Sequence, residues 1–72
     1  SDTPEENDMK LRLYGAIELL TDKQKFVVEM VGLKGYTETE VAEMMGIAQK
    51  NVHVLLDRAT VALRKHLMLN AG

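Results

Sequence analysis

Apolar residues recur along the second half of the chain with the three- and four-residue spacing of amphipathic helices. Between positions 37 and 67 they form two groups, separated by Gly46. Spacing of this kind gives each helix one buried stripe. The pattern predicts a short helix, a turn and a long helix. The apolar residues are Val41, Ala42, Met44 and Met45 in the first group, and Val52, Leu55, Leu56, Ala59, Ala62, Leu63 and Leu67 in the second.

The short helix has clear start and stop residues. Thr37 is followed three residues later by Glu40, the spacing of a capping box in which each side chain binds the other's backbone N–H. Gly46 is predicted to end the helix, because glycine enters the left-handed conformation without steric cost. Since Ala42 is small enough for the two helices to approach closely, the pattern favours a helix-turn-helix. An ordinary helical bundle joined by a turn is the alternative.

The first half of the chain predicts two further helices, at about residues 9–20 and 22–33. Leu13, Tyr14, Ile17 and Leu20 are expected to point inward from the first of them, while Leu11 and Leu19 give it a second apolar surface. The run from Thr21 to Gln24 is another capping box. The helix that follows has more apolar residues than one buried stripe needs. It is either central to the bundle or carries a surface patch for a partner.

Charge is distributed unevenly along the 72 residues. Residues 1–8 contain four acidic residues and no basic one, so their charge is −4, and the net charge of −2 leaves +2 for the remainder. This segment is predicted to be a disordered acidic tail, with Asn7 or Asp8 capping the first helix. Residues 9–69 then form one compact, all-α, four-helix domain. From position 49 onward the local charge is +3: Lys50, Arg58, Arg64 and Lys65 against Asp57.

Several classes of function find no support in the composition. The chain has no cysteine, and His53 and His66 are isolated, so neither a metal site nor another cofactor is expected. No nucleophile stands at a useful spacing from a base, and no phosphate-binding loop is present, so the protein is not expected to be an enzyme. No apolar run is long enough to span a membrane, and nothing resembles a signal peptide. The expected location is the cytoplasm.

Three stretches of sequence together resemble the fourth conserved region of bacterial RNA polymerase sigma factors. They are LTDKQKFVVEM, GYTETEVAEMMGI and NVHVLLDRATVALRKHL, and the resemblance covers about residues 9–68. It implies a winged-helix-type scaffold without a wing. The helix-turn-helix of quorum-sensing and response regulators is a related alternative. The ending in which Arg58-Ala59 is followed by Leu63-Arg64 favours the sigma family.

The resemblance implies that the long helix docks in the major groove of promoter DNA during transcription initiation. The first turns of such a helix face base edges, and flanking cations contact phosphates. The expected base-facing residues are Gln49, Lys50, His53 and Val54, with Asn51 near the edge and Asp57 further along; the expected phosphate contacts are Arg58, Arg64, Lys65 and, at a helix N-terminus, Thr37. The family usually has serine or threonine at Ala48 and basic residues at His53 and Leu55, so weak DNA binding is expected.

The resemblance also implies docking on RNA polymerase, through the β flap. The apolar surface of the first two helices is the expected contact, formed by Leu11, Leu19, Val27 and Val31. An anti-sigma or other regulatory protein and a second copy of the chain are further candidate partners; a membrane is not. The alternative function is a protein-interaction module on the same scaffold, with weak DNA binding or none. The mild positive charge and the surplus apolar surface favour that alternative.

Overall fold

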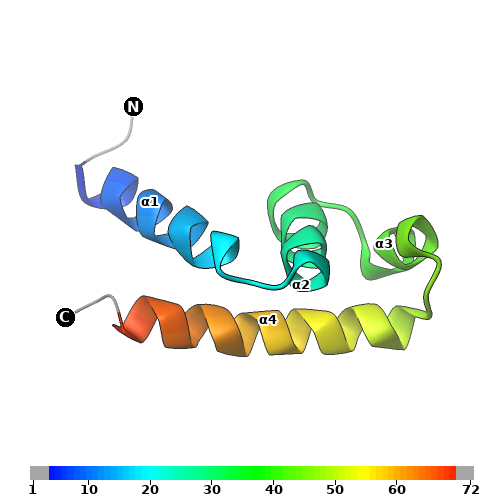
Figure 1. Ribbon diagram of the computed structural model, residues 1–72. Coiled ribbons are helices and arrows are strands. Elements are labelled where there is room, and N and C mark those ends of the chain that lie inside the picture. Colours follow the sequence, from blue (N-terminus) through cyan, green and yellow to red (C-terminus); the bar gives the residue numbers. More distant parts are fainter. Residues whose placement is uncertain (1–3, 70–72) are drawn as a thin grey trace.

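The computed structural model describes residues 4–69, and every regular element in this range is helical (Figure 1). In chain order these are α1 (Pro4–Glu18), α2 (Asp22–Val27), η1 (Val28–Leu33), α3 (Glu38–Met45) and α4 (Gln49–Leu69). Because η1 continues α2 directly, the two together form the predicted helix 22–33. The predicted all-α fold with a helix-turn-helix, formed by α3 and α4, is confirmed. Residues 1–3 of the predicted tail lie outside the described residues.

The first helix starts earlier than the sequence predicted. α1 begins at Pro4 rather than near Met9, so residues 4–8 are helical and were wrongly assigned to a disordered tail. Proline suits the first helical position because its φ is fixed near the helical value, and acidic residues nearby stabilise the positive end of the helix dipole. Within this turn Asp8 lies 3.2 Å from the Nε of Arg12. Asp8 therefore pairs along the helix instead of capping its start.

Both predicted capping boxes are present. The hydroxyl oxygen of Thr21 accepts from the N–H of Gln24 at 3.2 Å, and the Gln24 side chain accepts from the N–H of Thr21 at 3.3 Å. Thr37 and Glu40 make the same pair of bonds at 3.1 and 2.9 Å. These bonds hold the pKa of the Glu40 carboxyl below its ordinary value, chiefly through the backbone N–H of Thr37. The starts of α2 and α3 are thus set by local chemistry.

The end of α3 also follows the prediction. Gly46 adopts φ +68° and ψ +34°, the left-handed conformation, and its N–H still bonds back into α3. The N–H of Ile47 then donates to the carbonyl of Ala42 at 3.1 Å, which satisfies an end carbonyl of the helix. This turn sets the direction in which α4 leaves α3.

The second half of the predicted helix 22–33 is π-helical, which the sequence did not predict. In η1 the N–H of Lys34 reaches back five residues to the carbonyl of Glu29 at 3.0 Å, and that of Tyr36 reaches Met30 at 3.0 Å. A π turn includes one residue more than an α turn, so it changes which side chains face the core. Hydrophobic periodicity along six residues does not resolve such a change.

The core consists of two clusters that share α4. The first, here called the helix-turn-helix core, contains Val27, Val41, Ala42 and Val52, all at most 5% exposed. The second, here called the α1 core, contains Ile17, Leu20 and Ala59, with Leu13, Ala62 and Leu63 packed against it. Each of the seven apolar positions predicted along α4 is buried or half-buried. The predicted stripe of that helix is therefore confirmed.

Two inward-pointing predictions were wrong. Tyr14 is 52% exposed, and the neighbouring Ala16 occupies the buried position instead. Met44 on α3 is also exposed, because Val41 and Ala42 form the buried face of that short helix. Gly15 lies on the outside of α1, and a Cβ added there would meet no atom within 4 Å. Close packing therefore does not explain this glycine.

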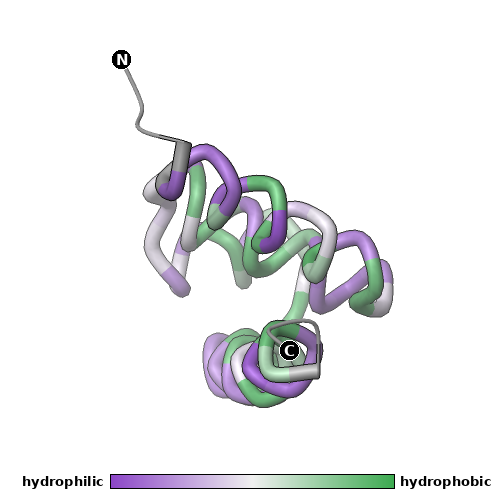
Figure 2. The backbone as a smooth tube through the Cα atoms, turned by 90° about the vertical axis from the view of Figure 1, so that its left-hand side faces the viewer, coloured by the Kyte–Doolittle hydropathy of each residue, from purple (hydrophilic) through white to green (hydrophobic). Residues whose placement is uncertain are grey.

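The helices form a flat layer on one side of α4. Figures 1 and 2 show α1, α2 and α3 above α4, with α3 beside its start and α1 over its C-terminal half. The molecule measures 39 × 27 × 14 Å along its principal axes. Lys25 of α2 binds Glu18 at the end of α1 at 2.8 Å, a hydrogen bond that raises the pKa of Lys25. No helix within residues 4–69 covers the opposite side of α4 (Figures 1 and 2).

Candidate nucleic-acid interface

The uncovered side of α4 holds most of the predicted DNA-facing residues. Its N-terminal turn follows Ala48, whose carbonyl accepts from the N–H groups of Asn51 and Val52 at 2.9 and 3.4 Å. The methyl side chain of Ala48 supplies no oxygen to the free N–H groups of this turn. Val52 points into the helix-turn-helix core and is fully buried. This burial fixes the rotation of α4, so that the intervening polar residues face outward.

Four predicted base-facing residues lie around one open hollow. The hollow has a volume of about 520 Å³ and is lined by Glu38 of α3 together with Gln49, Lys50, His53 and Val54 of α4. The amide of Gln49 and the ammonium of Lys50 match the hydrogen-bonding groups of adenine and guanine, and the Val54 methyl groups match that of thymine. Glu38 was not among the predicted site residues. No local pattern links it to α4, since the two segments meet only through the fold.

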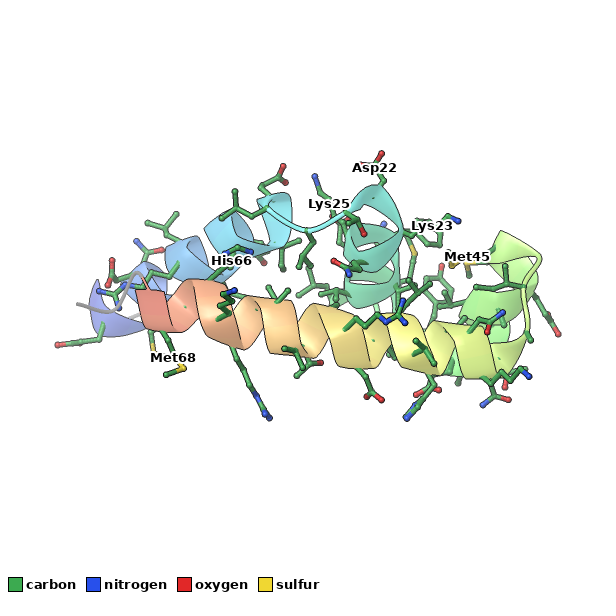
Figure 3. The ribbon with its side chains drawn as sticks, turned by 60° about the horizontal axis from the view of Figure 1, so that its bottom comes forward. Asp22, Lys23, Lys25, Met45, His66 and Met68 are labelled. Carbon is green, nitrogen blue, oxygen red and sulfur yellow. The ribbon has the colours of Figure 1, made fainter. Side chains whose placement is uncertain are left out.

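A second hollow, of about 420 Å³, lies where α2, the end of α3 and α4 meet. Lys23, Asn51 and Arg58 supply its polar lining, and Met45 and Val54 are among the apolar residues there. Figure 3 shows Lys23 and Met45 at this end of the molecule. The structure thus adds Lys23 to the predicted cation Arg58. Sequence reasoning missed Lys23 because it treated the residue only as part of a capping box.

The other two predicted phosphate contacts are at the far end of α4. Arg64 and Lys65 line a hollow of about 540 Å³ with Val61 and Met68, whose side chain points away from the other helices (Figure 3). Arg64 follows His53 by eleven residues, which places it about 16 Å further along the axis. On a bound duplex, Arg64 would therefore contact a different segment from the one that the base-facing residues contact.

Carboxylates reduce the positive charge of this surface near its start. Asp57 lies on the same side of α4 as His53, and its Oδ2 is 3.5 Å from the Nε2 of that histidine. At the start of α3, the N–H of Thr37 donates to Glu40 and is not free for a phosphate. Glu38 and Glu40 add negative charge in the same turn. Thr37 thus stays a predicted phosphate contact that the surrounding charges disfavour.

The predicted partner surface is only partly exposed. Leu11 and Leu19 are 64% and 61% exposed, as expected for a contact surface. Val27 is fully buried in the helix-turn-helix core, so its assignment to the partner surface was wrong; Val31 is half-buried and packs against the same core. Val27 faces inward because α2 packs against α4, and Val31 lies in the π-helical η1 that follows. Met9 and Tyr14, also exposed on α1, were not predicted.

An apolar groove lies beside α1, and Met9 lines it while Leu11 and Leu19 do not. It has a volume of about 350 Å³ and runs between α1 and the end of α4, lined by Met9, Lys10, Arg12, Leu13 and Leu67. No helix in residues 4–69 is long and apolar enough to cross a membrane.

The fold and the exposed side of α4 define a helix-turn-helix domain of the DNA-binding class. The chain belongs to the family of sigma-70 region 4 domains, whose model matches residues 10–63. This membership confirms the resemblance stated from the sequence and supports a DNA-binding role in transcription. Domains of this family are regulators rather than enzymes. Arg64 and Lys65 fall just beyond the matched residues.

Individual relatives agree with the family. The chain is 39% identical over 56 residues to the RNA polymerase sigma factor SigO of Bacillus subtilis (strain 168), which covers 78% of the chain and 32% of SigO. It is 42% identical over 50 residues to UPF0122 proteins of Thermoanaerobacter sp. (strain X514) and Thermoanaerobacter pseudethanolicus, which covers 69% of the chain and 41% of each relative. The match therefore spans 32% to 41% of the length of these relatives.

Proposed function

We propose that this domain binds promoter DNA with the start of α4 and docks on RNA polymerase with the apolar surface of α1. One observation carries the DNA proposal: Gln49, Lys50, His53 and Val54 gather around one hollow on the uncovered side of α4. Membership of the sigma-70 region 4 family supports the same role. Such a domain acts in the cytoplasm, where polymerase and promoter meet.

Binding of the isolated domain should be weak and only mildly dependent on salt. The described part of α4 carries four cations, and carboxylates stand close to Lys50 and His53. Since each phosphate contact releases counterions, few contacts give both low affinity and a shallow salt slope. Lys23 adds one cation beside Arg58 and lies where a phosphate backbone would pass along the hollow.

The DNA proposal is tested by a mobility shift at low salt with promoter and non-promoter duplexes. Lys50→Ala should relax sequence preference, whereas Arg64→Ala should weaken all sequences equally and lower the salt slope by about one. Lys25→Ala is the charge-matched control, because Lys25 binds Glu18 at the junction of α1 and α2. Equal effects of all three substitutions would contradict a surface centred on α4.

The polymerase proposal rests on the exposed apolar residues of α1. Leu11 and Leu19 are each more than 60% exposed, and the apolar groove runs beside α1. A helix with spaced apolar anchors fits such a surface. Leu11→Glu should abolish capture of the domain by the β flap, while Met44→Glu, at an exposed residue of α3, should not. Retention of the flap by Leu11→Glu would contradict the proposal.

The same exposed surface supports the second candidate, a protein-interaction module that binds DNA weakly or not at all. Its partner would be a regulatory protein, such as an anti-sigma factor, or a second copy of the chain. Sedimentation of the wild type and Leu11→Glu distinguishes these two partners. Concentration-dependent dimers that Leu11→Glu removes, together with no DNA shift at low salt, would favour this candidate over the first.

A further inference from the structure

His53 lies between two carboxylates that come from two helices. Its Nδ1 is 3.4 Å from one carboxylate oxygen of Glu38 and 3.5 Å from the other. Its Nε2 is 3.5 Å from Oδ2 of Asp57, one turn further along α4. Glu38 is the first residue of α3. The imidazole is therefore positioned by both helices of the helix-turn-helix, at the hollow assigned to base contacts.

The two carboxylates do not act equally on the ring. The Glu38 side chain is 30% exposed and directs both oxygens at Nδ1, whereas the Asp57 side chain is 70% exposed and offers one oxygen to Nε2. A carboxylate only accepts hydrogen bonds, and a neutral imidazole has one N–H and one lone pair. The imidazole N–H is favoured on the nitrogen that faces the less exposed carboxylate, which is that of Glu38. This difference favours the tautomer of neutral His53 that carries its proton on Nδ1.

This assignment makes Nε2 a hydrogen-bond acceptor. With the proton on Nδ1, the lone pair of Nε2 and the Oδ2 of Asp57 lie side by side on the uncovered side of α4. In the major groove, cytosine presents its N4 amino group and adenine its N6 amino group, while guanine and thymine present acceptors at O6 and O4. Two adjacent acceptors on the protein attract an amino group and repel those carbonyl oxygens.

We propose that Glu38 is a positioning residue that fixes the Nδ1–H tautomer of His53, so that His53 and Asp57 select an amino-bearing base. The selection rests on the proposed DNA-binding function, whereas the tautomer does not. Glu38 of α3 and Asp57 and Lys50 of α4 are the charged groups around the ring. No group of His, Asp and Glu residues in the described range could hold a metal ion.

The tautomer is measured directly by nitrogen NMR of the imidazole in the full chain, without DNA, at a pH where histidine is neutral. The Nδ1–H form should predominate in the wild type and become the minor form in Glu38→Gln, whose amide can donate to Nδ1. Glu43→Gln is the matched control, since it removes another exposed carboxylate of α3. Equal tautomer populations in the wild type and Glu38→Gln would overturn the proposal.

Base selection is measured with duplexes that carry each of the four base pairs at successive positions of the site. At one position the wild type should prefer an amino-bearing base by about fivefold, the lower end of what a good base contact provides. The Glu38→Gln variant should lose this base preference. It should keep the base preference at the position that Lys50 contacts. Preference unchanged in Glu38→Gln would overturn the selection. A changed tautomer with no binding of any duplex by the wild type would instead overturn the proposed DNA-binding function.

Discussion

The helices packed on the two halves of α4 differ in how completely their apolar side chains are buried. The N-terminal half packs against α2, η1 and α3, where Val27, Val41 and Val52 are fully buried. The C-terminal half packs mainly against α1, which leaves Met9, Leu11 and Tyr14 exposed. Both helix starts with capping boxes belong to the first region. We infer that the first region holds a recognition helix in place, while the second keeps apolar surface available to a partner.

The largest expected effect compares a buried with an exposed apolar residue. Val27→Glu places a carboxylate in the helix-turn-helix core and should cost several kcal/mol, much of the roughly 5–15 kcal/mol that keeps a small domain folded. Leu19→Glu changes an exposed side chain and should alter stability by no more than about 0.5 kcal/mol. Thermal unfolding followed by circular dichroism measures both. Similar losses in the two variants would show that the α1 surface is part of the core.

Overpacking at the helix crossing should have the next largest effect. Ala42 is 5% exposed between α3 and α4, so Ala42→Leu should destabilise the domain by about 1–3 kcal/mol. Met44→Leu on the exposed face of α3 is the control and should leave the melting temperature unchanged. A melting temperature unaffected by Ala42→Leu would remove the close approach on which the helix-turn-helix depends.

A substitution in α1 should act in the opposite direction. Gly15 lies in mid-helix with open space where a Cβ would stand, so Gly15→Ala should stabilise the domain by about 0.5–1 kcal/mol. Gly46→Ala is the contrasting variant, because its φ of +68° strains any residue with a Cβ. Urea unfolding of both variants gives the comparison. Destabilisation by Gly15→Ala would show that α1 is packed on both of its faces.

The smallest expected effect is a pH dependence of the α3 cap. Hydrogen bonds from Thr37 lower the pKa of Glu40 in the folded state, so the cap stabilises the fold above the unfolded pKa and loses this contribution as the pH falls through the folded value. The melting temperature should therefore fall below about pH 4.5. Glu40→Gln should show a shallower fall over the same range. Identical profiles would mean that other carboxylates account for the acid sensitivity.

Local features of the fold were predictable, and contacts between distant segments were not. The caps at Thr21 and Thr37 and the turn at Gly46 depend on residues at most five positions apart, and all three were predicted. The burial of Val27 depends on the packing of α2 against α4. The pairing of Glu38 with His53 joins residues fifteen positions apart. Periodicity describes the faces of one helix, but not which neighbour covers them.

In the candidate site, too, the residues on one helix were predictable and those from another helix were not. Gln49, Lys50 and His53 were placed together because they share one face of one helix, and Lys23 was missed because it comes from another. The start of α1 was misjudged for a different reason. Acidic composition was taken to indicate disorder, whereas proline followed by an acidic residue also begins helices.

The central claim is that DNA and a protein partner use separate surfaces of one domain. It is tested most directly by titrating the isotope-labelled chain with a promoter duplex at low salt and following its amide resonances. If DNA binds at the start of α4, the resonances of Gln49, Lys50, His53 and Val54 should shift, and those of Leu11 and Leu19 should stay unchanged. Shifts centred on α1, or none at any residue of α4, would contradict it.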